Sequence, residues 1–372
     1  MSTPKVRRTM LVSLLVVSGL LAGCSSDSPQ EQRVDEQALL FGNATPADSP
    51  AAPAANPVQL NSSLTTALGG SPVALHSVKN TLIVQGPRGI AVGDLAAITD
   101  GTADVVAISQ SCGPIAVAPT TTAFPAGAVT ISCPTDDAAA SATVTIYPLD
   151  KLDSPLTATV ASAINRATLT SEDSLVVGSD ADTQLTVYPV ASSGIAVDDG
   201  KTIKLDQVSD SLVAVPAADY LDGVVSVNDE KSKIGGVSLA EHDAAYLRGG
   251  RGIAQLIAAG DNTIAATDQR NNQLMVFTSS PLIMLHQTQT TGKSPWAVAW
   301  DEQAQLIYVS TTADNMLSSY DIHQGVPSLV GQVPTAADIR SVVVVGDNVV
   351  TLSANGTLDV LSADALATLR GE

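Results

Sequence analysis

The chain has 372 residues, of which 45% are hydrophobic, and a formal net charge of −19 at pH 7. This apolar content is enough for a large core, and so negative a surface repels nucleic acid and anionic lipid head groups, which excludes a nucleic-acid-binding function. A composition rich in Val, Ala and Thr and poor in Lys points to β-structure.

The N-terminus has the three parts of a secretory signal peptide. Basic side chains within residues 5–8 precede an apolar run over residues 10–21, and two small residues follow. A membrane-spanning helix needs about 20 apolar residues, and this run is little more than half that length. We therefore predict that residues 1–23 are removed and do not remain as an anchor.

The tetrapeptide Leu21-Ala22-Gly23-Cys24 resembles the lipobox of bacterial lipoproteins. The resemblance implies cleavage before Cys24 and a diacylglycerol on its sulfur. Lipid chains would hold the protein on the outer face of the cytoplasmic membrane, because each buried methylene contributes about 0.8 kcal/mol. The alternative is a chance cysteine beyond an ordinary signal peptide.

Residues 24–57 consist mainly of Ser, Asp, Gln, Ala and Pro, with TPADSPAAPAANP near the end. Such a composition cannot bury a core, so we predict a disordered tether between the lipid and a folded domain over residues 58–372. A flexible chain of this length spans roughly 30 Å, which would hold the domain off the bilayer.

Short apolar runs recur through the folded domain with a mean period of about 44 residues, which is typical of four-stranded propeller blades. The runs are centred near residues 83, 130, 176, 213, 265, 308 and 350. The later units align over their whole length, and Asn355-Gly356 favours a type I′ hairpin. We predict an all-β fold, a seven-bladed β-propeller; a pair of β-sandwiches is the alternative.

One unit carries a family resemblance. LIYVSTTADNMLSSYDI, residues 306–322, is similar to the YVTN-type β-propeller repeat, with Tyr308-Val309-Ser310 in place of the usual tripeptide, Asn315 in the turn and Asp321 closing the third strand. The other units keep the strand spacing of this repeat but not its characteristic residues. The chain as a whole also resembles actinobacterial prolipoproteins of the LppL type, on its general pattern and its lipobox.

The second blade contains the remaining cysteines, Cys112 and Cys133, which are equidistant from a loop centre near residue 123. On antiparallel strands they would lie opposite each other, with Cβ atoms within about 5 Å. Outside the cytoplasm this predicts a disulfide, and two buried free thiols are the alternative.

Catalytic patterns are scarce. The four histidines are His76, His242, His286 and His323. They fall in different repeat units, and none has a metal-ligand neighbour at i+2 or i+4, so we expect no metal and no cofactor. No nucleophile or phosphate-binding motif occurs. Asp180 and Asp182, or Asp261 and Asp268, could pair in a cleft, although acidic turns are more often simply solvated.

Three units place an arginine where the innermost strand begins: Arg166, Arg251 and Arg340. Repeat symmetry would bring these cations toward one mouth of the central channel, where guanidinium groups suit a carboxylate or phosphate. The alternative is that each arginine pairs with an Asp of a neighbouring blade, as Asp338 beside Arg340 suggests.

Two segments are left open by the pattern. Residues 241–252 break the strand pattern, and we expect a short helical insert there. The outer strand of the last blade could come from the segment beginning at Val58 or from ALATL near the C-terminus.

Together these features predict a non-catalytic, monomeric lipoprotein whose propeller binds or scaffolds another envelope or membrane component, a protein partner of unknown identity. Propellers offer broad rigid faces, although fold alone does not fix function. The alternatives are a lactonase-like or dehydrogenase-like propeller enzyme and a small-anion binding protein that uses Arg166, Arg251 and Arg340.

Overall fold

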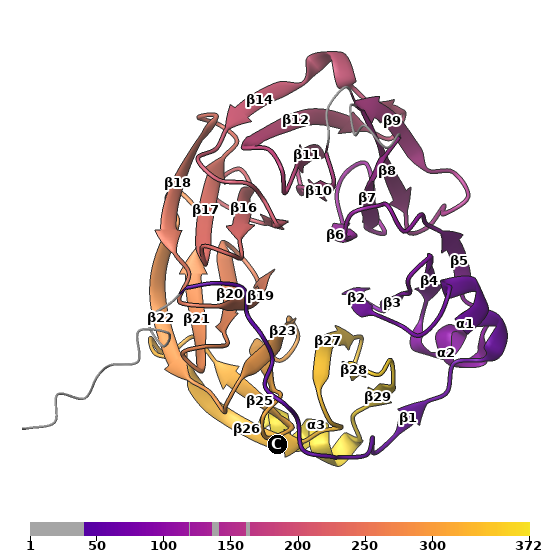
Figure 1. Ribbon diagram of the computed structural model, residues 1–372, viewed down its shortest axis with the longest axis vertical. Helices are drawn as coiled ribbons and strands as arrows, with labels where there is room; N and C mark the ends of the chain where they lie inside the picture. Colours follow the sequence, from indigo (N-terminus) through magenta and orange to yellow (C-terminus); the bar gives the residue numbers. More distant parts are fainter. Residues whose placement is uncertain (1–40, 119, 136–140, 161–163) are drawn as a thin grey trace, which may run out of the picture. The chain divides into compact units, whose positions relative to one another are not determined.

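Seven antiparallel sheets follow one another around a common axis, which confirms the predicted seven-bladed β-propeller (Figure 1). The computed structural model describes residues 41–118, 120–135, 141–160 and 164–372. The predictions for the signal peptide, for lipidation at Cys24 and for the first part of the tether lie outside the described residues.

Each blade is a meander that runs from an inner to an outer strand. Blade 1 contains β2 (Ala74–Val78), β3 (Thr81–Gln85), β4 (Gly89–Gly93) and β5 (Asp104–Ala107), with α2 (Leu95–Asp100) before its outer strand. Blade 2 contains β6 (Ala116–Ala118), β7 (Ala128–Pro134), β8 (Ala142–Pro148) and β9 (Leu156–Val160). Blade 3 contains β10 (Arg166–Leu169), β11 (Ser174–Gly178), β12 (Gln184–Ala191) and β14 (Lys201–Lys204), with β13 (Gly194–Ile195) and the 3-10 turn η2 (Val197–Asp199) between the last two.

Blades 4 to 6 are more regular. Blade 4 contains β15 (Ser211–Val215), β16 (Gly223–Asn228), β17 (Lys233–Ser238) and β18 (Asp243–Arg248). Blade 5 contains β19 (Ile253–Ala258), β20 (Thr263–Asp268), β21 (Gln273–Thr278) and β22 (Met284–Thr290). Blade 6 contains β23 (Pro295–Asp301), β24 (Leu306–Thr311), β25 (Met316–Asp321) and β26 (Ser328–Pro334).

Blade 7 closes the ring with strands from both parts of the chain. It contains β27 (Ile339–Val345), β28 (Asn348–Ser353), β29 (Leu358–Val360) and, as outer strand, β1 (Pro57–Val58). Of the two closures left open by the sequence, the structure shows the N-terminal one. ALATL instead lies in the helix α3 (Ala363–Arg370), capped by Ser362 and packed against β26. A further helix, α1 (Ser62–Leu68), packs on β4 and β5.

The core consists of seven apolar clusters, and each fills the interface between two neighbouring blades. Because the middle strands of a blade pack against a neighbour on both faces, they are buried along their whole length, as β16 and β24 are. This double burial explains why the repeats read as continuous Val, Ile and Leu runs rather than as alternation.

Two local predictions were wrong, and one repeat run has another place in its blade than the rest. The run near residue 213 is the inner strand β15, whereas the other runs are second strands, because β15 and β16 are both rich in Val. Residues 243–248 form the outer strand β18, whose half-exposed polar pattern hid it. The turn at Asn355-Gly356 is not of type I′, because only Gly356 has a positive φ (+84°). The Asn355 side chain instead accepts a hydrogen bond from the Thr357 N–H (3.0 Å), which belongs to a longer turn.

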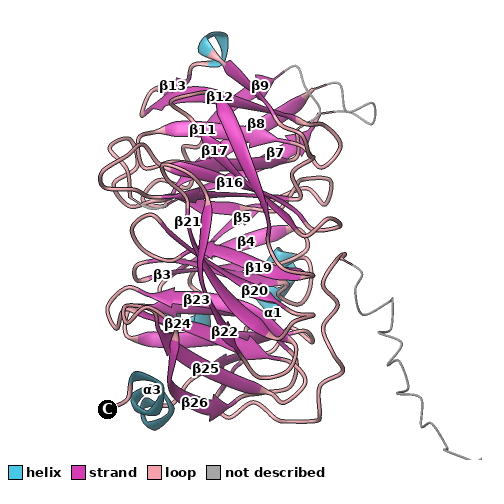
Figure 2. Ribbon diagram, turned by 90° about the vertical axis from the view of Figure 1, so that its left-hand side faces the viewer, coloured by secondary structure: helices cyan, strands magenta, loops and turns pink. Residues whose placement is uncertain are grey.

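Residues 41–56, here called the strap, lie extended along blades 4 to 7 before β1 begins (Figures 1 and 2). The sequence predicts a tether as far as Pro57, whereas this segment hydrogen-bonds to the propeller. Gly42 N–H donates to Arg251 O (3.1 Å), and Ala337 N–H donates to Ala52 O (3.0 Å). An Ala- and Pro-rich segment builds no core of its own, but its backbone groups pair with the turns beneath it.

The disulfide between Cys112 and Cys133 is confirmed, with Cα atoms 4.0 Å apart. The register of β6 and β7 pairs Ala116 with Thr130, so the residues that precede β6 lie beside the C-terminal end of β7. Cys112 lies in this segment before β6, and the disulfide joins it to Cys133 on β7, the second strand of the blade.

Replacing Cys112 and Cys133 together by Ala is expected to lower the free energy of unfolding by about 3 kcal/mol, because the cross-link no longer restricts a loop of this size in the unfolded chain. Denaturant unfolding with and without reductant measures the effect. Reductant should lower the stability of the wild-type protein and leave the variant unchanged; equal stability of both proteins without reductant would contradict the prediction.

Candidate functional site

The inner strands surround a cavity of about 960 Å³ along the propeller axis. Its walls are mainly apolar and come from successive blades, including Val117, Val213, Ile257, Trp300 and Val344. A space of this volume with apolar walls is the kind of cavity that holds a small ligand.

Polar and charged side chains are also part of the lining. His76 on β2 contacts Gln85 through Nε2 and Oε1 (3.3 Å), and burial lowers its pKa, so the imidazole is neutral at pH 7. Lys79, Asp261 and Glu302 stand where inner strands end. The charged side chains of the lining therefore lie where inner strands begin or end, and neutral polar side chains such as Thr168 and Gln255 lie between them.

The three arginines singled out in the sequence stand where inner strands begin, at the same end of the ring. Arg166 alone among them lines the cavity; its Nη2 pairs with Asp180 (2.9 Å) and its Nε donates to Asp210 O (2.6 Å). Arg340 pairs with Asp338 (Nε to Oδ1, 2.7 Å). Anion binding by these arginines stays a prediction.

The carboxylate pairs have separate structural roles. Asp180 pairs with Arg166, and Asp182 accepts from the Thr183 N–H (2.6 Å). Asp261 accepts from the Ala218 N–H (2.7 Å). Asp268 is fully buried and accepts from the backbone N–H groups of Arg251, Gly252 and Asn271. Among the residues that the structure describes, no group of three or more His, Cys, Asp or Glu is arranged to hold a metal ion.

One carboxyl group near Arg166 is electrostatically strained. Burial, together with the charge of Asp210, raises the pKa of Asp229 to about 6, although Arg166 opposes the shift. Because the folded-state pKa lies above the unfolded value, ionisation of Asp229 opposes folding. The cost is absent below about pH 4, grows as the pH rises, and is complete above about pH 6.

Replacing Asp229 by Asn is therefore expected to raise the free energy of unfolding by about 1–2 kcal/mol at pH 7.5 and to leave it unchanged at pH 4. Denaturant unfolding at both pH values, with Glu230→Gln as the neighbouring exposed control, measures this. A stabilisation that is equal at both pH values would contradict the assignment.

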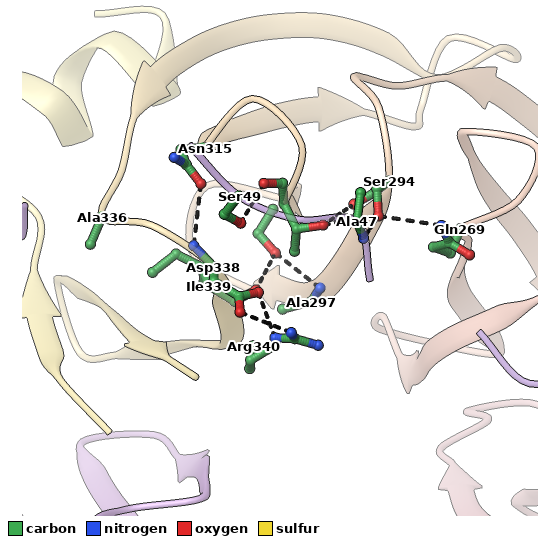
Figure 3. A network of polar contacts seen from close by, with 12 residues as sticks. Ala47, Ser49, Gln269, Ser294, Ala297, Asn315, Ala336, Asp338, Ile339 and Arg340 are labelled. Atoms are coloured by element: carbon green, nitrogen blue, oxygen red, sulfur yellow. Dashed lines mark hydrogen bonds and ion pairs between the residues drawn. The ribbon is translucent and has the colours of Figure 1, made fainter. Parts of the chain in front are cut away.

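The strap is held by the turns of blades 5 and 6 (Figure 3). The buried Ser294 accepts through Oγ from the Ala47 N–H (3.0 Å), and Ser49 Oγ donates to Thr312 O (2.5 Å). Asn315, the turn residue of the YVTN-like unit, donates through Nδ2 to Pro50 O (2.6 Å) and accepts at Oδ1 from the Asp338 N–H (3.2 Å). The repeat asparagine thus joins two blades and the strap.

Charge is divided between the two ends of the ring. We call the end at which the inner strands begin, and along which the strap lies, the strap face. Most of the described Lys and Arg lie there: Arg88, Arg166, Lys204, Lys231, Lys233, Arg248, Arg251, Arg270, Lys293 and Arg340. The opposite face carries the remaining described cations, Lys79, Lys151, Lys201 and Arg370, together with most of the described Asp and Glu.

The outer strands of the neighbouring blades 5 and 6 are β22 and β26 (Figures 1 and 2). Exposed apolar side chains lie on these strands or just before them. We call this surface the apolar rim; it consists of Leu282, Met284, Leu285, Val326, Leu329 and Val330. Gln287 Nε2 donates to Ile322 O (3.3 Å) and links the two blades. This surface was not predicted from the sequence; the signal that could have found it is the occurrence of apolar residues in outer strands.

Comparison with known proteins supports the β-propeller fold and identifies no family. No family model matches the chain, and no curated protein matches it. The described part of the chain has no helix long and apolar enough to cross a membrane.

Solved structures of similar fold were found at low sequence identity. The β-propeller domain of Myceliophteria thermophila Cps50 (Swd1) is 12% identical with a TM-score of 0.56, covering 79% of this chain and 97% of that one. A chain of the mitotic checkpoint complex is 12% identical with a TM-score of 0.57, covering 93% and 99%. Virginiamycin B lyase from Staphylococcus aureus is 11% identical with a TM-score of 0.52, covering 77% and 93%. Because these neighbours include a chain of one complex and a lyase, the likeness establishes a β-propeller and leaves its activity open.

Proposed function

We propose that this protein is a lipid-anchored, non-catalytic propeller that binds a protein partner of the cell envelope through the apolar rim. The anchor is proposed from the signal peptide and the lipobox at Cys24. The binding role is proposed from the rim, and this surface is the observation that carries the proposal.

The outer strands β22 and β26 each expose two large apolar side chains, whereas the outer strand β5 exposes one. Outer strands face solvent, and exposed apolar patches on a soluble protein commonly mark contact with another protein. Each of the rim strands β22 and β26 is the last strand of its sheet, and α3 packs against β26. A partner that covers Met284 and Leu329 would remove these exposed apolar side chains from water.

The polar groups that could serve catalysis support a binding role instead. Asp180, Asp261 and Asp268 are engaged with arginine or backbone N–H groups, and His76 contacts Gln85 rather than a carboxylate. Each of these contacts gives its polar side chain a structural role, and a general base must in addition lie within hydrogen-bond reach of a substrate proton.

Site-specific photo-cross-linking in cells tests the partner surface. A benzophenone side chain at Met284 or Leu329 should capture one envelope protein of defined mass, identified by mass spectrometry. Val105, which is 41% exposed on β5 of blade 1, is the matched control and should capture nothing. Capture of the same proteins from all three positions, or from none, would overturn the role of the rim.

Labelling with radioactive palmitate tests the anchor separately. Label should enter the wild-type protein and be absent from Cys24→Ser, which should also leave the membrane fraction. Label that persists in Cys24→Ser would place the lipid elsewhere and contradict the proposal.

A further inference from the structure

We propose that the strap face docks on the anionic surface of the membrane at the point where the strap begins, so that the propeller sits with its opposite face toward the outside. This inference rests on the proposed anchor at Cys24. It concerns a surface, Lys231, Arg248, Arg270 and Lys293 around Phe41, that we call the docking patch.

The strap begins on this patch. The guanidinium of Arg248 lies over the ring of Phe41, 3.4 Å from its centroid. Arg270 Nη2 donates to Asn43 O (3.1 Å), and Gly42 N–H donates to Arg251 O (3.1 Å). The start of the strap is therefore fixed on the strap face, beside the outer end of blade 4 and the turn of blade 5.

Chain length keeps this patch near the bilayer. Only residues 24–40 separate Cys24 from Phe41, and a fully extended segment of this length reaches at most about 60 Å. The lipid on Cys24 would thus raise the local concentration of the bilayer for the surface at which the strap begins. The far side of the ring has no comparable attachment among the described residues.

The charges of the two faces differ in the sense that favours this contact. All four cations of the docking patch are exposed, whereas the carboxylate of Asp268 is buried and that of Asp206 pairs with Lys233 (2.7 Å). Exposed acids also lie beside them: Glu230 next to Lys231, and Asp48 and Asp314 near Lys293. Basic clusters next to an anchored segment bind anionic lipid head groups, and this attraction weakens as salt rises.

The opposite face would be repelled by the same lipids. Its carboxylates far exceed the four cations there, so the overall negative charge of the protein is concentrated away from the patch. Phe41 adds an aromatic ring, 43% exposed, at the level of the cations. Aromatic rings beside cations are favoured at the head-group level of a bilayer.

The experiment uses the chain from residue 24 with an anchor added chemically, so that it does not depend on lipidation in cells. The disulfide occupies Cys112 and Cys133, which leaves Cys24 as the thiol to couple to maleimide-phosphatidylethanolamine. Vesicles of phosphatidylcholine alone are compared with vesicles that also contain phosphatidylglycerol. Hydroxyl-radical labelling then reports Phe41 on the strap face and Tyr220 on the opposite face, both exposed.

Labelling of Phe41 should fall at least about threefold on anionic vesicles at low salt, and recover at high salt, while Tyr220 stays unchanged. The variant Lys231→Gln, Arg248→Gln, Lys293→Gln should abolish the difference. The matched variant Lys79→Gln, Lys151→Gln, Lys201→Gln removes the same charge from the opposite face and should retain it.

Equal labelling of Phe41 on both vesicle types, or protection of Tyr220 instead, would overturn the docking of this face. An equal effect of the two triple variants would overturn the role of the patch. Absence of palmitate on Cys24 in cells, or of a partner at the rim, would count against the proposed function alone, because the vesicle experiment supplies its own anchor.

Discussion

Replacing Asp301 by Asn is expected to lower the free energy of unfolding by about 3–5 kcal/mol, the usual cost of removing one partner from a buried ion pair. Asp301 ends β23 and is fully buried. Its Oδ2 pairs with Arg370 Nη2 (2.9 Å) and accepts from the Tyr308 hydroxyl (2.9 Å). Its Oδ1 accepts from the N–H groups of Gln303 and Ala304.

The loss should be large because the amide cannot replace these contacts. Asn keeps the volume of the side chain, so no cavity forms, but it leaves the half-buried guanidinium of Arg370 without its counter-charge. Burial and the hydrogen bond to Asp301 raise the pKa of Tyr308, which therefore stays a neutral donor at neutral pH. Since Arg370 belongs to α3, the C-terminal helix should detach from blade 6 before the propeller unfolds.

Denaturant unfolding gives the free energy, and hydrogen exchange of residues 363–370 reports the helix. Asp321→Asn is the matched control, because Asp321 pairs with the exposed His323 (2.9 Å) at the end of β25 and should contribute less than about 1 kcal/mol. If both Asn variants are equally stable, the buried contact is not what holds α3.

The seven blades could be predicted from the sequence because each blade contains a short apolar run, which is a local feature of the chain. Middle strands buried on both faces must be continuous apolar runs, and β3, β7, β11, β20, β24 and β28 all carry one. The same rule misled at β15, an inner strand as apolar as a middle one, and at β18, a half-exposed outer strand. A local run of apolar residues indicates that a strand is buried, but it does not indicate whether that strand is the inner or a middle strand of its blade.

The candidate sites depended on contacts that local pattern does not contain. The sequence shows arginines at the starts of inner strands, and it shows Asp338 beside Arg340, but it does not show that Arg166 pairs with Asp180 fourteen residues further along the chain. The strap was hidden because its partners, such as Ser294 and Asn315, are more than two hundred residues away in the chain. A segment without apolar periodicity gives no sign of where it docks.

Replacing Asp359 by Asn is expected to cost about 3 kcal/mol or more, because two charge-assisted hydrogen bonds converge on this carboxylate and each contributes about 1.5–3 kcal/mol. Asp359 lies on β29 and is 3% exposed. Its Oδ2 accepts from the Ala55 N–H (3.1 Å) and its Oδ1 from the Asn56 N–H (2.5 Å). An amide offers one acceptor in place of two and turns an N–H group toward another.

These bonds fix the chain directly before β1, so the variant should release the outer strand of blade 7 and the strap together. Hydrogen exchange should rise over residues 41–58 and over β29, and thermolysin should cut the strap, while the other blades keep their protection. Asp347→Asn, in the exposed turn of the same blade, is the control and should change neither.

Unchanged exchange over residues 41–58 in Asp359→Asn would show that the turns of blades 5 and 6 hold the strap without help from blade 7. Release would mean that one buried carboxylate couples closure of the ring to the path of the chain toward Cys24. In that case the docking patch should also lose Phe41 in the variant, since the strap carries this ring to the strap face.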